Sequence, residues 1–190
     1  MKGDSFYQRM SSGKYIDMGN FTEEDVDLRD INVSLNHILR FNGHHADVAP
    51  LTVAQHSLLC YNMAVIFEPD EYLLHQAVLQ HDFAEAYVGD VATPIKRAMG
   101  SLWVDFATPI EETVERVFLG AKMGPEMHER VKVYDTAALD IERRVMWHSQ
   151  YGKDKWPASP LGVGNLEDKH ELFEALPAYV DLAQMWKDNS

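Results

Sequence analysis

Apolar residues recur at intervals of three and four along most of this chain, and this period constrains its fold more than any other feature. The most regular stretch places Val131, Tyr134, Ala138, Ile141 and Val145 on one face of an α-helix. A strand would instead need apolar residues at every second position. The sequence therefore predicts an all-α protein.

Capping residues and helix breakers indicate where the helices begin and end. Thr52 and Gln55 form a capping box, Gly89 is a C-terminal stop, and Thr108 precedes a first-turn proline. On this basis we expect helices from Leu28 to Asn42, Thr52 to Glu68, Leu73 to Gly89, Thr108 to Phe118, Gly124 to Val145, and Leu172 to Trp186.

The length of 190 residues fits one domain, because domains typically contain about 100 to 200 residues. Hydrophobic residues make up 46% of the chain, so a chain of this size can form an apolar core. We expect a single domain over residues 1–190, with 1–21 as an N-terminal extension. Residues 149–166 are expected to be a loop, because this stretch is rich in glycine and proline.

The charge of the chain limits its partners. There are 17 basic and 30 acidic side chains, which gives a net charge of −13. Because contacts to phosphate dominate the binding of nucleic-acid polymers, this charge disfavours such polymers and anionic membranes as partners. The N-terminus shows no secretory signal, and no apolar run approaches the ~20 residues that span a membrane. We expect a cytoplasmic protein.

Cys60 is the one cysteine of the chain, which rules out an intrachain disulfide and a thiolate-rich zinc cluster. Any metal site is therefore expected to consist of histidine and carboxylate. Burying a His-Asp pair, or an aspartate beside an apolar stripe, is costly unless a cation compensates the charge. Residues of these types that could bind Zn, Mn, Co, Fe or Ni are His56, His81, Asp82 and Asp135.

We expect the predicted helices to place these four side chains around one ion. On a helix, His81 and Asp82 lie about 100° apart, so that one ion fits between them. His56 and Asp135 would approach the same ion from neighbouring helices. Glu85 lies four residues after His81 on the same helical face, where its carboxylate is placed to act as a general acid or base. We expect a single metal ion.

The order and spacing of these residues resemble the HD phosphohydrolase superfamily, whose members hold a divalent metal with the pattern H…HD…D. Four blocks resemble its deoxynucleotide-hydrolysing branch, which includes bacterial 5′-deoxynucleotidases and phage dATP triphosphohydrolases. The blocks are Arg40-Phe41-Asn42-Gly43-His44, Val53-Ala54-Gln55-His56-Ser57-Leu58, His81-Asp82-Phe83-Ala84-Glu85, and Gly89-Asp90 through Thr93-Pro94-Ile95-Lys96.

This resemblance implies an HD-type helical bundle that forms a homo-oligomer and holds one divalent transition metal ion, with Zn, Co or Mn favoured. The residues that it assigns to the metal are His56, His81, Asp82 and Asp135.

The resemblance also implies roles around the metal. Glu85 and Asp90 would handle protons of the attacking water, and Arg40 and Lys96 would hold the substrate phosphate. Phe41 stands where the nucleotidases commonly have tryptophan, so that an aromatic wall is kept.

The implied reaction is attack of water on the phosphorus bonded to the nucleoside 5′-oxygen. We expect a dNTP such as dATP as substrate, with deoxynucleoside and triphosphate as products. A dNMP 5′-nucleotidase that releases phosphate is the alternative. A non-catalytic nucleotide sensor, and a hydrolase of a cyclic nucleotide or an alarmone, are further possibilities. Glu85 and Asp90 argue against the sensor, because binding alone requires neither.

Overall fold

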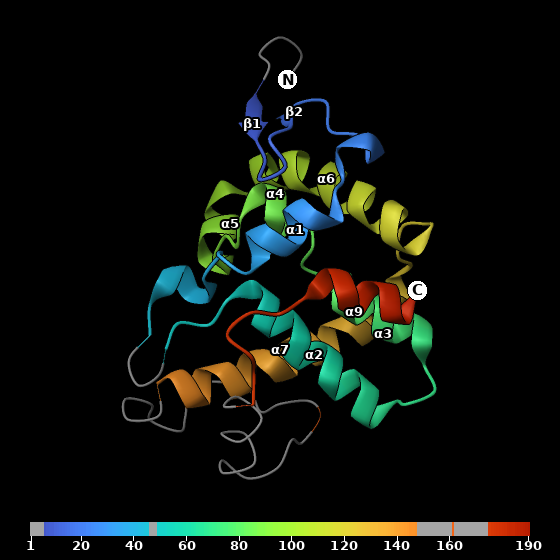
Figure 1. Ribbon diagram of the computed structural model, residues 1–190. Helices are drawn as coiled ribbons and strands as arrows, with labels where there is room; N and C mark the ends of the chain where they lie inside the picture. The colour runs from blue at the N-terminus through green and yellow to red at the C-terminus, as the bar shows by residue number, and fades with distance from the viewer. Residues whose placement is uncertain (1–5, 46–48, 148–160, 162–174) are drawn as a thin grey trace.

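The computed structural model describes residues 6–45, 49–147, 161 and 175–190, and most of these residues are helical (Figure 1). A short antiparallel hairpin of β1 (Tyr7–Arg9) and β2 (Tyr15–Asp17) precedes the helices. The helices are η1 (Glu23–Asp25), α1 (Leu28–Leu35), η2 (Arg40–Gly43), α2 (Val53–Phe67), α3 (Tyr72–Gln80), α4 (Glu85–Val88), α5 (Thr93–Met99), α6 (Ser101–Leu119), α7 (Pro125–Met146) and α9 (Leu182–Asn189). The prediction of an all-α protein is confirmed.

Helices α2, α3 and α7 pack against one another and form the part of the core that carries the candidate site. The apolar stripe of α7 faces this core, and its buried members are Val131, Tyr134, Ala138, Ile141 and Val145. Burying a large apolar side chain contributes roughly 1.5–3 kcal/mol. The stripe therefore fixes α7 against α2 and α3, as its spacing predicts.

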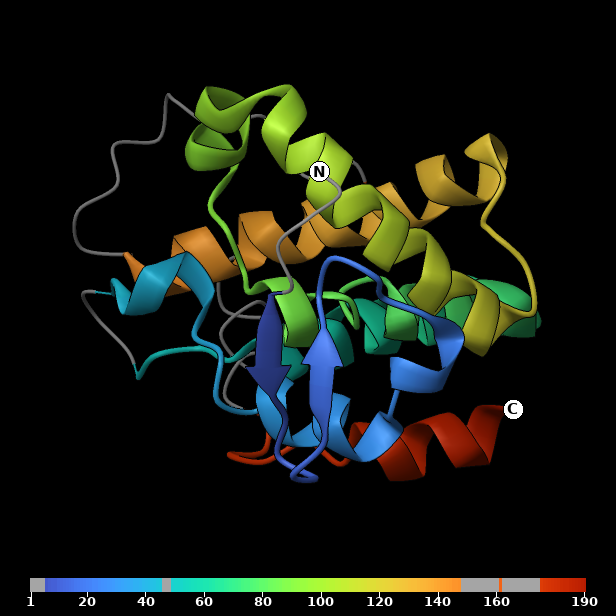
Figure 2. The same ribbon diagram turned by 90° about the horizontal axis from the view of Figure 1, so that it is seen from above.

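The N-terminal hairpin lies next to α1 and α4 (Figure 2). Ile16 and Met18 are buried in the cluster of apolar residues that these elements share. Asp30 on α1 accepts hydrogen bonds from the Ser12 backbone N–H at 2.6 Å and from the Ser12 hydroxyl at 2.7 Å. The described part of the segment expected to be an extension is therefore packed against α1. The assignment of residues 1–190 to one domain stays a prediction.

The helix predicted over Leu73–Gly89 is wrong in its middle part. Helix α3 ends at Gln80 and α4 begins at Glu85, with tight turns between them. Within these turns the Glu85 N–H donates to the Asp82 carbonyl, three residues back, at 2.9 Å. Such bonds wind the backbone more tightly than an α-helix does. The regular helical turn expected between His81 and Glu85 is therefore absent.

The first predicted helix ends at Leu35 rather than near Asn42. The Asn36 side chain donates to the carbonyl groups of Asn32 at 2.8 Å and Val180 at 2.9 Å. Its oxygen accepts a hydrogen bond from the Val180 N–H at 2.9 Å. These hydrogen bonds connect the end of α1 to the segment before α9. The sequence pattern does not reveal this long-range contact.

The helix start predicted at Thr108-Pro109 is wrong, because both residues lie inside α6, which begins at Ser101. A threonine followed by proline is typical of a helix start, because proline lacks the donor that an interior position needs. In α6 the proline is nevertheless accommodated, and the Thr113 hydroxyl donates to the Pro109 carbonyl at 2.7 Å.

The loop predicted over 149–166 lies outside the described residues except at position 161, and so does the start of the last predicted helix. Within the described C-terminal residues, 177–180 are not helical, so the helix predicted across Pro177 is wrong there. Helix α9 begins at Leu182, and the Asp181 side chain accepts a hydrogen bond from the Gln184 N–H at 3.0 Å. Among the described helices, none is both long and apolar enough to cross a membrane.

Candidate metal centre

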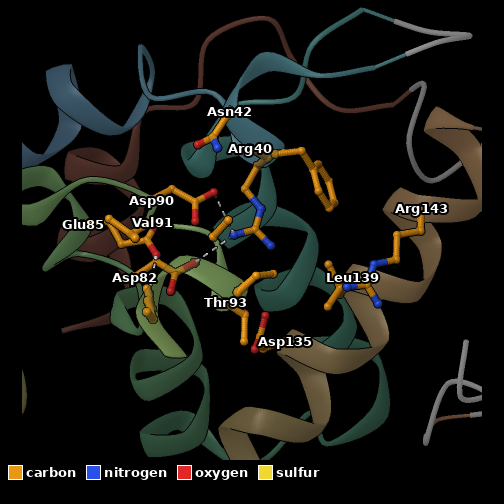
Figure 3. Close-up of a pocket in the computed structure, with 14 residues that line it drawn as sticks. Arg40, Asn42, Asp82, Glu85, Asp90, Val91, Thr93, Asp135, Leu139 and Arg143 are labelled. Carbon is orange, nitrogen blue, oxygen red and sulfur yellow. Dashed lines mark hydrogen bonds and ion pairs between the residues drawn. The ribbon is translucent and has the colours of Figure 1, made fainter. Parts of the chain in front are cut away.

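The structure brings the four predicted metal ligands together where α2, α7 and the turn between α3 and α4 meet. His56 Nε2 lies 3.5 Å from Asp82 Oδ2 and 3.3 Å from Asp135 Oδ1. His81 Nε2 lies 3.2 Å from the same Asp82 oxygen. Figure 3 shows Asp82 and Asp135 lining one pocket. Three segments that are distant in sequence thus supply one cluster.

Both imidazoles are held by a hydrogen bond at Nδ1, which leaves Nε2 facing the cluster. His56 Nδ1 lies 2.5 Å from Glu142 Oε1, and His81 Nδ1 lies 2.7 Å from the Val78 carbonyl oxygen. Because both partners are acceptors, each Nδ1 is assigned a hydrogen, so that each ring in its neutral form would offer the Nε2 lone pair to an ion. Metal-binding histidines are typically oriented in this way.

The His81 Nε2 atom shows that these residues fit a metal ion. This atom is buried, and although it lies 3.2 Å from Asp82 Oδ2 it makes no well-aligned hydrogen bond with the residues that the structure describes. A buried polar atom without a partner is costly, and a bound cation would remove that cost. Two imidazole nitrogens and two carboxylates so close together are a ligand set that suits a divalent transition metal.

Arg40 is a buried counter-charge of the cluster. Its Nη1 lies 3.4 Å from Asp90 and 4.0 Å from Asp82, and its Nη2 lies 3.4 Å from Glu142. Although burial opposes the charge, these carboxylates hold the pKa of Arg40 above its ordinary value. One guanidinium does not balance these carboxylates together with Asp135. Further positive charge can come from His56 and His81, whose pKa the neighbouring acidic groups raise although burial opposes it, or from a bound divalent cation.

Glu85 and Asp90 lie beside the predicted metal ligands. Glu85 is buried, its Oε1 lies 3.9 Å from Lys96 Nζ, and its Oε2 has no hydrogen-bond partner within the described segments. Burial, together with the charges of Asp82 and Asp90, raises the pKa of Glu85 well above its ordinary value. Burial also raises the pKa of Asp90, although Arg40 opposes this change. Their proposed roles with protons stay predictions.

A turn with unusual backbone angles presents Arg40 and Phe41 to the site. Phe41 and Asn42 are consecutive non-glycine residues with φ of 56° and 54°. Such conformations cost about 1–3 kcal/mol each, and they concentrate at functional sites. The Arg40 N–H donates to the Leu51 carbonyl at 2.8 Å, which anchors the start of the turn. The Phe41 ring packs edge-on against the Trp147 ring, with centroids 4.9 Å apart.

Two cavities adjoin the cluster. The first, of about 280 Å³, is shown in Figure 3, and its lining includes Arg40, Phe41, Asp82, Glu85, Asp90, Lys96 and Asp135. The second, of about 400 Å³, is bordered by α6 and α7 and includes His81, Glu111, Glu115 and His128 in its lining. Residues that line both cavities are Asp82, Glu85, Lys96 and Asp135. The cluster is therefore reachable from two cavities.

Two residues of α7 belong to the site but were not predicted. Glu142 and Arg143 follow Asp135 by seven and eight positions, which is two helical turns, so they share its face. Glu142 holds His56, and Arg143 lines the first cavity. The spacing from Asp135 was the signal that could have found them.

Cys60 is a third residue of the site that was not predicted. The ligand atoms of His56, Cys60 and His81 all lie within 4.8 Å of one another. Burial raises the pKa of the Cys60 thiol to about 11, although the neighbouring His56 opposes this change. The expectation that a metal site here consists of histidine and carboxylate alone stays a prediction, and Cys60 is a further possible ligand beside it.

Two bacterial proteins are similar in sequence to this chain. The "Uncharacterized protein YfdR" of Escherichia coli (strain K12) is 36% identical over 135 residues, which make up 70% of this chain and 68% of that protein. The "Uncharacterized protein RCAP_rcc00048" of Rhodobacter capsulatus is 31% identical over 140 residues, or 72% of this chain and 70% of that protein. No family model matches the chain.

Among solved structures, a similar chain is described as "Cyanophage S-2L HD phosphohydrolase (DatZ) bound to dA and one catalytic Zn2+ ion". It is 24% identical in sequence, with a TM-score of 0.41, and the match covers 83% of this chain and 95% of that chain.

Proposed function

This chain belongs to the same family as YfdR and RCAP_rcc00048, and from its site we propose that it is a metal-dependent phosphohydrolase. The bond to be cleaved joins phosphorus to the 5′-oxygen of a deoxynucleoside. A dNTP such as dATP is the favoured substrate, with deoxynucleoside and triphosphate as products. The resemblance of the four sequence blocks to deoxynucleotide-hydrolysing HD enzymes supports this choice.

One observation carries the proposal. His56 and His81 are each held at Nδ1, and each Nε2 faces carboxylate oxygens at 3.2 to 3.5 Å. His81 Nε2 is buried and makes no hydrogen bond within the described residues, and a cation among the neighbouring carboxylates would satisfy this atom. The proposed ligands of that cation are His56, His81, Asp82 and Asp135.

The chain's own residues would position the substrate and move protons. A divalent ion held at the cluster would lower the pKa of water and polarise a phosphoryl group. Glu85 is proposed to accept the proton of the attacking water, because a buried carboxyl with a raised pKa readily takes up a proton. Asp90 is proposed to assist in this transfer, and it pairs with Arg40 at 3.4 Å.

Basic side chains of the first cavity would hold the phosphate. Arg40, Lys96 and Arg143 all line this cavity. Local positive charge matters here, because the net charge of −13 opposes the approach of an anion. The Arg40 Nε atom is buried and has no hydrogen-bond partner in the described part of the chain, so a phosphate oxygen could accept from it. Phe41 would form the aromatic wall of the same cavity.

A dNMP 5′-nucleotidase with the same residues is the second candidate, and the size of the cavity favours it. The volume of about 280 Å³ lies just below the ~300–1,000 Å³ that is typical of ligand pockets. A monophosphate needs less room than a triphosphate does.

The products decide between these candidates. The metal-loaded protein is incubated separately with dATP and with dAMP, and the released anions are identified. Inorganic triphosphate from dATP supports the favoured function, and orthophosphate from dAMP supports the alternative. Failure to hydrolyse either nucleotide, in protein that demonstrably holds metal, would contradict both.

The Glu85→Ala variant separates an enzyme from a nucleotide sensor. If the protein hydrolyses its substrate through Glu85, the variant keeps its metal and its nucleotide binding but loses turnover. A sensor would bind nucleotide equally well with and without Glu85 and would show no turnover in either form. Activity against cyclic nucleotides or alarmones, measured in the same assay, tests the remaining possibility.

A further inference from the structure

Cys60 lies beside the predicted metal ligands, at a place from which its thiolate could bind the same ion. It follows His56 by four residues on α2, so both side chains leave the same face of the helix. Its side chain is fully buried, and its Sγ lies 3.5 Å from His56 Nε2. Cys60 therefore reaches the same nitrogen as Asp82 and Asp135 do.

A second observation points to a cation at this place. The side chain of His81 is only 9% exposed, yet its Nε2 atom has no hydrogen-bond partner in the segments that the structure describes. The same histidine belongs to the cluster of possible ligand atoms formed with Cys60 and His56. A bound ion would satisfy His81 and would lie within reach of the sulfur.

The spacing of the atoms matches ligands on one metal ion. Zinc binds histidine nitrogen at about 2.0–2.1 Å and cysteine sulfur at about 2.3 Å, so two such ligands at 90° to 120°, the angles of a five-coordinate site, lie about 3.1 to 3.8 Å apart. The observed distance from Cys60 Sγ to His56 Nε2 is 3.5 Å. Nitrogen and oxygen ligands lie about 3 to 3.5 Å apart by the same reasoning, and Asp135 lies 3.3 Å from that nitrogen.

We propose that Cys60 is a further ligand of the metal centre and makes the centre select Zn²⁺ or Co²⁺ over Mn²⁺. This inference rests on the proposed function, which supplies the metal. Thiolate sulfur favours the softer ions, whereas carboxylate and water oxygens suit Mn²⁺. Two histidines and two aspartates without the sulfur would discriminate less between these ions.

The proposed ligation changes protonation and involves no oxidation or reduction. The Cys60 thiol lies 3.5 Å from His56 Nε2 and donates to the Tyr134 carbonyl at 3.8 Å. When the bond between metal and sulfur forms, the S–H bond breaks and the proton passes to solvent. Zinc binding to the wild type therefore releases a proton that a Cys60→Ala variant does not release, which calorimetry in buffers of different ionisation enthalpy measures.

Cobalt spectroscopy of the full chain tests the inference directly, because the chain has one cysteine. The wild type loaded with Co²⁺ is expected to show the near-ultraviolet charge-transfer band of a cobalt thiolate, and Cys60→Ser is expected to lack it. Ser57→Ala, which changes another buried side chain of α2, is the matched control and keeps the band. The metal content of each sample is measured in parallel.

The affinities of the wild type and of Cys60→Ala for Zn²⁺ and Mn²⁺ provide a second test of the proposal. The Zn²⁺ affinity of Cys60→Ala is expected to fall about tenfold or more, and its Mn²⁺ affinity to change much less. Bound cobalt without the charge-transfer band in the wild type would overturn the role of Cys60 and leave the proposed function standing. A wild type that binds neither cobalt nor zinc would overturn the proposed function as well. Should Cys60→Ser fail to fold, the wild-type spectrum alone still decides.

Discussion

Glu85 is held where its negative charge is unfavourable, and this has consequences for stability. Burial and the charges of Asp82 and Asp90 raise its pKa. The folded state therefore holds the Glu85 proton more tightly than the unfolded state does. The free energy of unfolding of the metal-free protein should thus fall as the pH rises from about 4.3, the ordinary glutamate value, through the raised pKa.

Replacing Glu85 with Gln removes this charge. We expect metal-free Glu85→Gln to melt at a higher temperature than the wild type, with a difference that grows as the pH rises, and to lose hydrolysis when metal is restored. Thermal unfolding in chelator across the pH range and turnover with metal measure the two effects. Unchanged hydrolysis would remove Glu85 from the mechanism.

Glu142 acts on the metal centre through His56, whose Nδ1 it holds at 2.5 Å. Removing such an orienting partner typically costs 10–100-fold in metal affinity, and we expect Glu142→Gln to weaken Zn²⁺ binding by about this factor. Glu126→Gln, at an exposed position of the same helix, is the matched control. Equal zinc affinity in both variants would show that Glu142 does not orient the histidine.

Single residues show what a sequence pattern can and cannot predict. The convergence of His56, His81, Asp82 and Asp135 was predicted, because their order and spacing form a distinctive set and their chemistry suits one ion. Cys60 was missed although it follows His56 by four positions on the predicted helix, because its closeness to His81 is visible only once α2 is seen to face that residue.

Among the helices, the capping signals in the sequence predicted the start correctly where contacts within the helix determine that start. The capping box predicted at Thr52 forms, with the Gln55 N–H bonded to the threonine hydroxyl at 3.2 Å and the Thr52 N–H bonded to the Gln55 side chain at 2.9 Å. The break between Gln80 and Glu85 was missed, because nothing in those residues forbids a helix. Contacts with distant segments decide the conformation there.

Glu68, the residue that caps the end of α2, is bonded to two residues of α7, and the stability that this link provides depends on pH. The Tyr134 hydroxyl donates to Glu68 Oε1 at 2.6 Å, and Arg130 pairs with the other oxygen at 2.5 Å. The hydrogen bond from Tyr134, aided by Arg130, lowers the pKa of Glu68. This stabilisation is therefore complete above the ordinary glutamate pKa and is lost as the pH falls through the lowered value.

Tyr134→Phe tests this link. We expect the variant to be less stable than the wild type by roughly 1 kcal/mol or less at neutral pH, because the glutamate is partly solvated. The difference should shrink in acid, below about pH 4. Denaturant unfolding at several pH values measures it, with Tyr72→Phe at an exposed position as control. A difference that does not vary with pH would contradict the assignment.

At the scale of the whole molecule, metal binding should couple to folding, because the proposed ligands come from α2, the turn after α3, and α7. An ion that binds the folded state alone stabilises it by about 2.7 kcal/mol at a concentration one hundred times its Kd. We expect Zn²⁺ to raise the melting temperature and a chelator to lower it. A melting temperature that is indifferent to both would mean that these segments do not share an ion.

Two histidines and two aspartates from separate segments are proposed to close around one cation. Anomalous diffraction from a crystal of the zinc-loaded protein would locate that ion. We expect a single strong peak within bonding distance of His56, His81, Asp82 and Asp135. A zinc-loaded crystal with no peak at these four side chains, or with its peak elsewhere in the molecule, would contradict the proposal.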